Sequence, residues 1–428
     1  MKRLKKVTIQ NDNDYNFQCF LINIENPSIN KTNFITQTDF FHEYIHYLQS
    51  ISCPFLFSQF THFANKLATI GSAITKESVW GVNDDYADKI AAEFFDFYYL
   101  GNLPYIKNNS FSSIDTILGF EKKDLILDGT QLKTYTLKFM DTNGEDIDHI
   151  ICGRDLLENL AIIIEEAYYG PQNQLPDIPY RIVDNVINSY YSSLTISKYQ
   201  IAQLIEFSLN TIDPVAFLFE QLDRLSNEEN IPSDLYTYIF STMKFMSIDG
   251  KNFTVETLAG RLLSDSIKSL TNILGNIALA DDTNYIVDKL GRGINYRFTA
   301  KNSSFIADLI TKKTSVNDLI KLFGLPLVHF HDDTIYSTEF YGQKPTLIPA
   351  ILESVYEALT YNVDVNNGKI PECSGAVKCI LTSYCQEHDN REGAHYFSVE
   401  CMNNPYKRVD IGTVNCPYSL YLQSKKLI

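Results

Sequence analysis

The spacing of apolar side chains along the chain predicts a protein built mainly from helices. Apolar residues recur every three or four positions, the repeat of one buried helix face, over 39–68, 85–100, 154–169, 303–323 and 346–360. From about 180 to 280 the same repeat returns in several segments, separated near Pro214, Pro232 and Gly250. We therefore expect most of the second half of the chain to be helical.

Short runs of β-branched and aromatic residues predict a smaller β component. These runs lie at 6–10, 17–24, 123–151 and 325–337. The third run contains turn signals at Asp128-Gly129 and Asn143-Gly144, which indicate a β-meander. The expected fold class is therefore α+β and predominantly α-helical.

These elements suggest three parts of the chain. Residues 1–175 hold one helix-and-meander unit, residues 176–365 a mainly helical domain, and residues 366–428 a cysteine-rich tail. We expect the helical domain to complete a cleft against the first unit.

The net charge of the chain argues against two classes of protein, those that bind nucleic acid and those that bind anionic membranes. The chain has 36 Lys and Arg residues against 52 Asp and Glu residues, for a net charge of −16. Binding to nucleic acid or to an anionic membrane surface needs a basic face, so we expect neither partner. No apolar run has the length of a signal peptide or of a transmembrane helix, which predicts a cytoplasmic protein.

One short motif carries recognisable chemistry. Residues 42–46 read His-Glu-Tyr-Ile-His within a helical pattern. Residues four apart lie on one helix face, so His42 and His46 can place two imidazole nitrogens on one Zn²⁺. Glu43 lies beside them and can take a proton from a water on the metal. The alternative is a polar helix face with two hydrogen-bonded histidines.

The motif resembles that of the zincin metallopeptidases. The metzincin branch continues with Gly and His at the positions held here by Gln49 and Ser52, so that branch is excluded. The uninterrupted helix is more similar to that of the gluzincins, in which a Glu on a later helix completes the zinc site. The resemblance implies a zincin-like core in residues 1–175.

The resemblance also suggests where the third ligand lies. Glu158 and Ala161 form a Glu-x-x-Ala step in the helix predicted over 154–169, similar to the third-ligand helix of several gluzincins. Glu165 lies seven residues further on the same helix face and is the other candidate. Glu166 is expected to face solvent.

Two further groups could assist the chemistry. His329 and His331 alternate on a predicted strand and share one face, where one could donate to a reaction oxyanion. Tyr168 and Tyr169 end the predicted ligand helix and could do the same. His149 is expected to be structural.

The cysteines concentrate near the end of the chain. Five of the 8 lie in the tail, at Cys373, Cys379, Cys385, Cys401 and Cys416. In a reducing compartment such a cluster favours a metal over disulfides. A structural Zn²⁺, an iron–sulfur cluster and buried free thiols all remain open.

Taken together, these features predict a zinc metallopeptidase that hydrolyses peptide bonds in a peptide or protein substrate. His42, His46 and Glu158 are its expected metal ligands and Glu43 its general base. The alternative is a helical interaction or scaffold protein that keeps a zincin-like fold without turnover.

Overall fold

The computed structural model describes the helical and sheet-forming core of the chain. The described residues are 14–16, 20–24, 29, 33–61, 112–127, 130–172, 175–243, 246–248, 251–274, 280–299, 304–330, 335–336, 382, 385–386 and 398–403. The predicted strand at 6–10 and the predicted helices at 85–100 and 346–360 lie outside them.

Helices dominate the described residues, which confirms the expected predominantly helical α+β class. They are α1 (Thr38–Ser52), α4 (Gly153–Tyr169), α5 (Ile182–Tyr190), α6 (Lys198–Ser208), α7 (Pro214–Leu225), α8 (Leu235–Thr242), α9 (Val255–Leu274), α10 (Ala280–Thr299), α11 (Leu309–Lys312), α12 (Val316–Phe323) and α15 (Glu400–Asn403). A 3-10 turn, Phe34–Thr36, precedes α1. Within the described residues, no helix is long and apolar enough to cross a membrane.

The strands form small sheets. The first has the order β1 (Asp14–Asn16), β2 (Leu21–Ile24), β8 (Leu327–Phe330) and β9 (Ile335–Tyr336). Strands β2 and β8 pair in parallel, and the other pairs are antiparallel. The second sheet is an antiparallel meander of β3 (Ile114–Leu127), β4 (Thr130–Asp141) and β5 (Asp146–Ile150), and the third joins β6 (Met246–Ile248) to β7 (Lys251–Phe253).

The meander confirms the prediction for 123–151, but its first strand begins earlier than predicted. The register between β3 and β4 shifts between Ile114 and Thr116 and again between Ile117 and Gly119. Each β-bulge interrupts the two-residue alternation of inward and outward side chains. The sequence pattern of a strand is therefore lost over the first part of β3.

The prediction of one helix over 39–68 is wrong at Cys53. Helix α1 ends at Ser52, and Cys53 has an extended backbone with φ −96° and ψ 117°. The cause is Pro54, which disfavours a helical conformation in the residue before it and is itself accepted in the first turn of a helix. Residues 54–61 are helical again, and 62–68 lie outside the described residues.

The predicted helix over 303–323 is likewise divided. Helix α11 ends at Lys312, Lys313 has a left-handed φ of 45°, and α12 begins after Ser315, whose hydroxyl accepts from the backbone N–H of Asp318. The N-cap residue thus starts a new helix where the apolar spacing alone suggested continuity.

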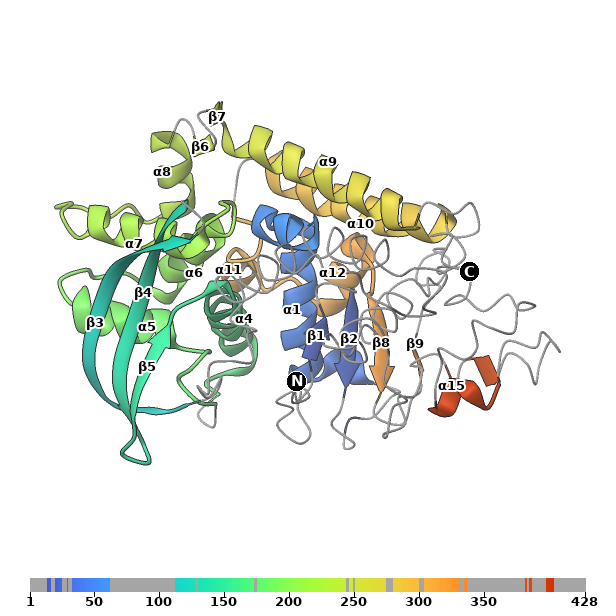
Figure 1. Ribbon diagram of the computed structural model, residues 1–428, viewed down its shortest axis with the longest axis horizontal. Helices are drawn as coiled ribbons and strands as arrows, with labels where there is room; N and C mark the ends of the chain where they lie inside the picture. The colour runs from blue at the N-terminus through green and yellow to red at the C-terminus, as the bar shows by residue number, and fades with distance from the viewer. Residues whose placement is uncertain are drawn as a thin grey trace.

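Helix α1 lies at the centre of the molecule (Figure 1). It packs against α4, α10 and the sheet that contains β1 and β2. Its apolar residues Phe40, Phe41 and Leu48 are 0% exposed. The hydroxyls of Tyr44 and Tyr47 each donate to a backbone carbonyl at the end of α12, at 2.8 Å. Packing and hydrogen bonds therefore both fix α1 within the core.

The contact between α1 and α10 requires a glycine. A Cβ atom on Gly293 would lie 2.0 Å from the carbonyl oxygen of Ile51, a backbone atom that cannot rotate away. We therefore expect Gly293→Ala to force the two helices apart and to lower the free energy of unfolding by about 1–3 kcal/mol, measured by urea denaturation.

Gly291, on the same helix, is the matched control for that substitution. A Cβ atom there meets nothing within 4 Å, so Gly291→Ala should stabilise the helix by roughly 0.5–1 kcal/mol. Equal effects of the two substitutions would contradict a steric role for Gly293.

Candidate metal centre

The two motif histidines lie on the side of α1 that faces α4. Their ring centroids are 4.9 Å apart, as expected for residues one helical turn apart. The side chain of His42 is 11% exposed and that of His46 is 12% exposed. Both imidazoles are therefore held largely out of water.

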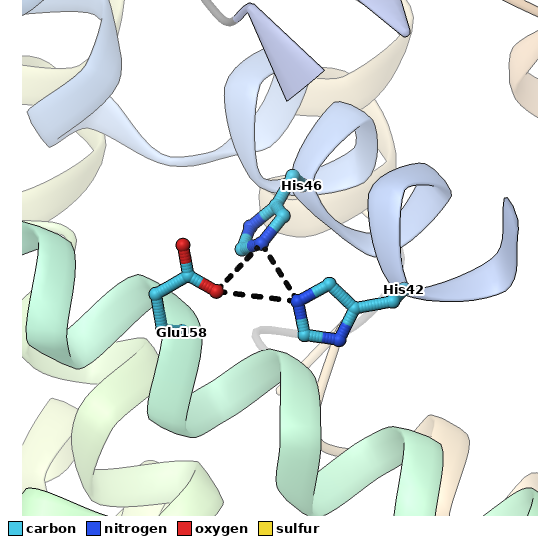
Figure 2. A group of neighbouring side chains, drawn as sticks. All are labelled: His42, His46 and Glu158. Carbon is cyan, nitrogen blue, oxygen red and sulfur yellow. Dashed lines mark hydrogen bonds and ion pairs between the residues drawn. The ribbon is translucent and has the colours of Figure 1, made fainter. Parts of the chain in front are cut away.

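Helix α4 supplies the carboxylate opposite them. The helix begins where the side chain of Asp155 accepts from the backbone N–H of Cys152, at 2.9 Å, an arrangement that satisfies an N-terminal donor. Glu158 lies one turn later and Ala161, 0% exposed, one turn further. Figure 2 shows the Glu158 side chain directed from α4 toward the two histidines of α1.

Three donor atoms of these side chains form a nearly equilateral triangle. Nε2 of His42, Nε2 of His46 and Oε2 of Glu158 are each 3.2 Å from the other two. Donor atoms bound to one tetrahedral ion at about 2.0–2.1 Å lie roughly 3.3 Å apart. Among the described residues, His42, His46 and Glu158 form the one group of three or more side chains that could hold a metal ion in this way. The residues present fit Zn²⁺.

The other ring nitrogens of the histidines have partners of their own. Nδ1 of His42 lies 2.7 Å from Oε2 of Glu165, and Nδ1 of His46 lies 2.7 Å from Oε1 of Gln49. A hydrogen bond donated by Nδ1 leaves Nε2 with a lone pair, which is the form of histidine that binds a metal. Glu165, one of the two candidates for third ligand, thus lies on the far side of the His42 ring from the triangle.

The electrostatics of the cluster favour a positive charge at its centre. Burial disfavours a charged imidazole, but hydrogen bonds to Glu158 and Glu165 and the charge of Glu43 raise the pKa of His42 well above its usual value. Burial also disfavours a charged carboxylate, yet the charges and hydrogen bonds of the two imidazoles hold the pKa of Glu158 well below its usual value. A cation shared by these groups would satisfy all of them.

Three other side chains lie close to the cluster. Glu43, 7% exposed, acts on His42 through its charge. The guanidinium Nε of Arg154 lies 3.7 Å from Oε1 of Glu158, the oxygen outside the triangle. The ring of Tyr180 meets that of His42 edge-on, with centroids 5.9 Å apart. Sequence reasoning missed Arg154 and Tyr180; only the spacing of Arg154, four residues before Glu158, gave a signal.

The remaining candidate residues have other partners. The hydroxyl of Tyr168 donates to the carbonyl of Thr314 at 2.8 Å, and Nδ1 of His329 lies 3.2 Å from the side-chain oxygen of Asn23 on β2. Nε2 of His149 lies 2.9 Å from the Asp155 carboxylate, a structural contact at the start of α4. His331 lies outside the described residues.

The predicted second metal site lies in the cysteine-rich tail. Cys385 and Cys401 are buried, and Cys373, Cys379 and Cys416 lie outside the described residues. A structural Zn²⁺ or an iron–sulfur cluster there stays a prediction.

Comparison with known proteins adds no family to these observations. The chain matches no protein-family model, and neither the curated proteins nor the solved structures contain a match. The arrangement of the His42–His46–Glu158 cluster is compatible with an H-E-x-x-H motif, and this cluster is the feature that bears on function.

Proposed function

We propose that this chain is a zinc-dependent hydrolase of the zincin type that cleaves peptide bonds. The observation that carries the proposal is the triangle of donor atoms from His42, His46 and Glu158. It joins a two-histidine helix motif to a carboxylate 112 residues from His46, and a catalytic zinc takes three protein ligands and leaves one position open.

Each residue has a distinct part in this proposal. His42 and His46 bind through Nε2 and Glu158 through Oε2. Zn²⁺ held there would act as a Lewis acid toward the substrate carbonyl and make the attacking water more acidic. Glu43, next to His42 in the chain, accepts the proton of that water and returns it to the leaving amine. Glu165 orients the His42 ring through Nδ1 and does not bind the metal.

The assignment of the third ligand predicts an order of effects. Glu158→Ala removes a donor atom, whereas Glu165→Ala removes only the partner of a ligand, which typically weakens metal binding about 10–100-fold. We therefore expect Glu158→Ala to lower zinc affinity more than Glu165→Ala, measured by competition with a chromophoric chelator.

Glu166→Ala is the control for those variants. Glu166 also lies on α4, but its carboxylate pairs with Arg181 at 2.6 Å, and its loss should leave zinc affinity close to that of the wild type. If Glu165→Ala lowers zinc affinity more than Glu158→Ala does, Glu165 rather than Glu158 is the third ligand.

The function itself is tested by metal content and cleavage together. The purified protein should bind about one zinc at this centre, lose it on substitution of both His42 and His46 by Ala, and cleave members of a diverse peptide library. Zinc content unaffected by the double substitution would overturn the metal centre. Zinc binding without any cleavage, including that of cell-extract proteins, would favour the non-catalytic scaffold alternative.

A further inference from the structure

Gln49 uses both ends of its amide within the core. The residue is 0% exposed. Its Oε1 lies 2.7 Å from Nδ1 of His46 on the same helix, and its Nε2 donates to the backbone carbonyl of Leu157 on α4, at 3.0 Å. Gln49 therefore connects the second motif histidine of α1 to the helix that carries Glu158.

The Leu157 carbonyl determines which way the Gln49 amide points. A carbonyl oxygen only accepts hydrogen bonds, so the NH₂ end of the amide has to face Leu157. The oxygen end then faces His46, and Nδ1 of His46 has to be the donor of that bond. Because a neutral imidazole carries one proton, Nε2 of His46 keeps its lone pair on the side of His42 and Glu158.

The hydrogen bond from Gln49 to the Leu157 carbonyl also helps to position Glu158. Leu157 directly precedes Glu158, so a hydrogen bond to its carbonyl fixes the helix backbone next to the Glu158 Cα atom. One buried side chain thus acts on two ligands that come from different helices. Of the three donor residues, Glu165 is hydrogen-bonded to His42, through Nδ1.

We propose that Gln49 is a positioning residue of the metal centre: it selects the His46 tautomer with Nε2 unprotonated and holds α4 where Glu158 completes the donor triangle. The proposal rests on the proposed function, because it assumes that the triangle binds zinc. It predicts that the centre is organised before any metal arrives.

The first test observes the His46 tautomer directly in the wild-type chain. Nitrogen-15 chemical shifts of histidine distinguish the Nδ1–H tautomer from the Nε2–H tautomer, and free neutral histidine prefers the latter. In zinc-depleted protein, under alkaline conditions that leave imidazoles neutral, His46 should be in the Nδ1–H form. A predominant Nε2–H form for His46 would overturn the selection of the tautomer.

The second test measures zinc affinity and the visible spectrum of the cobalt-substituted protein. Gln49→Met keeps the length and the burial of the side chain but removes both hydrogen bonds. We expect zinc affinity to fall about 10–100-fold and the cobalt bands to shift, because His46 and Glu158 are no longer held in place. Both readouts are independent of substrate cleavage.

Tyr47→Phe is the matched control. It removes one buried hydrogen bond from α1 to the backbone carbonyl of Phe323, at 2.8 Å, without touching a ligand. Both variants should lose thermal stability, but Tyr47→Phe should keep the wild-type zinc affinity and cobalt spectrum. If the Gln49→Met protein also keeps the wild-type zinc affinity and cobalt spectrum, Gln49 only stabilises the fold.

The outcomes for the two proposals are separable. Wild-type protein that binds no zinc overturns the metal centre itself. Wild-type protein that binds zinc, with no change on Gln49→Met, overturns only the role of Gln49. If Gln49→Met does not fold, the tautomer measurement on the wild-type chain still decides the proposal.

Discussion

Glu43→Gln is expected to lower the rate of peptide hydrolysis about 10²–10⁴-fold while zinc content stays at the wild-type level. The amide has nearly the size and shape of the carboxylate, but it cannot accept a proton from water at neutral pH. Zinc should remain because Glu43 lies outside the donor triangle of His42, His46 and Glu158. The measurement is kcat/KM on a peptide that the wild-type protein cleaves, with metal analysis of the same preparation.

Glu166→Gln provides the control for this experiment. It makes the same chemical change in a carboxylate of α4 that pairs with Arg181, so hydrolysis should continue at close to the wild-type rate. If Glu43→Gln also cleaves at the wild-type rate, with zinc bound, Glu43 is not the general base and the zincin mechanism is wrong for this chain.

The shared helix face of His42 and His46 could be predicted because its signal is local. His42 and His46 are one helical turn apart, and the helix period alone puts them on one face. Glu158 required a resemblance between helices, since nothing in the spacing of 112 residues shows that α4 lies against α1. The structure supplies that contact and places Oε2 of Glu158 at 3.2 Å from both imidazole nitrogens.

The partners of the histidines were harder to predict. In the sequence, Gln49 stands out only as a departure from the metzincin pattern, although its position three residues after His46 puts it on the same face of α1. The sequence makes Glu165 a candidate ligand because it shares a helix face with Glu158. It does not show which residues of α1 lie opposite Glu165. The roles of both residues depend on how α1 and α4 are aligned along their axes. No local sequence pattern predicts that alignment.

The same distinction between local and non-local signals separates the fold elements. The meander of β3, β4 and β5 is joined by short turns, and its strands could be predicted from them. The pairing of β2 with β8 joins segments that are 306 positions apart at Asn23 and His329, and no sequence pattern indicated it. The end of α1 before Pro54 was predictable from proline chemistry alone.

A buried ion pair holds the far end of α1. The side chains of Arg297 on α10 and Glu206 on α6 are both 0% exposed, with Nη1 and Oε1 2.8 Å apart. Arg297 also donates to the hydroxyl of Ser52, the last residue of α1, at 3.0 Å. The Glu206 carboxylate accepts from the backbone N–H groups of Phe305, Ile306 and Ala307, at 2.8–2.9 Å. The end of α1, helix α6, helix α10 and residues 305–307 therefore meet at one charge pair.

Arg297→Met is expected to lower the free energy of unfolding by about 3–5 kcal/mol, because it leaves the Glu206 carboxylate buried without a cation. Urea denaturation measures the loss as a lower midpoint at an unchanged slope. The double variant Arg297→Met/Glu206→Gln should be less destabilised than the single one, since no buried charge remains.

On the same helix, Arg292 pairs with Asp288 at 2.8 Å, but both side chains are 45% exposed, so Arg292→Met should change stability little. If Arg297→Met unfolds at the wild-type midpoint, the ion pair contributes nothing to stability, and other contacts hold the end of the helix that carries His42 and His46.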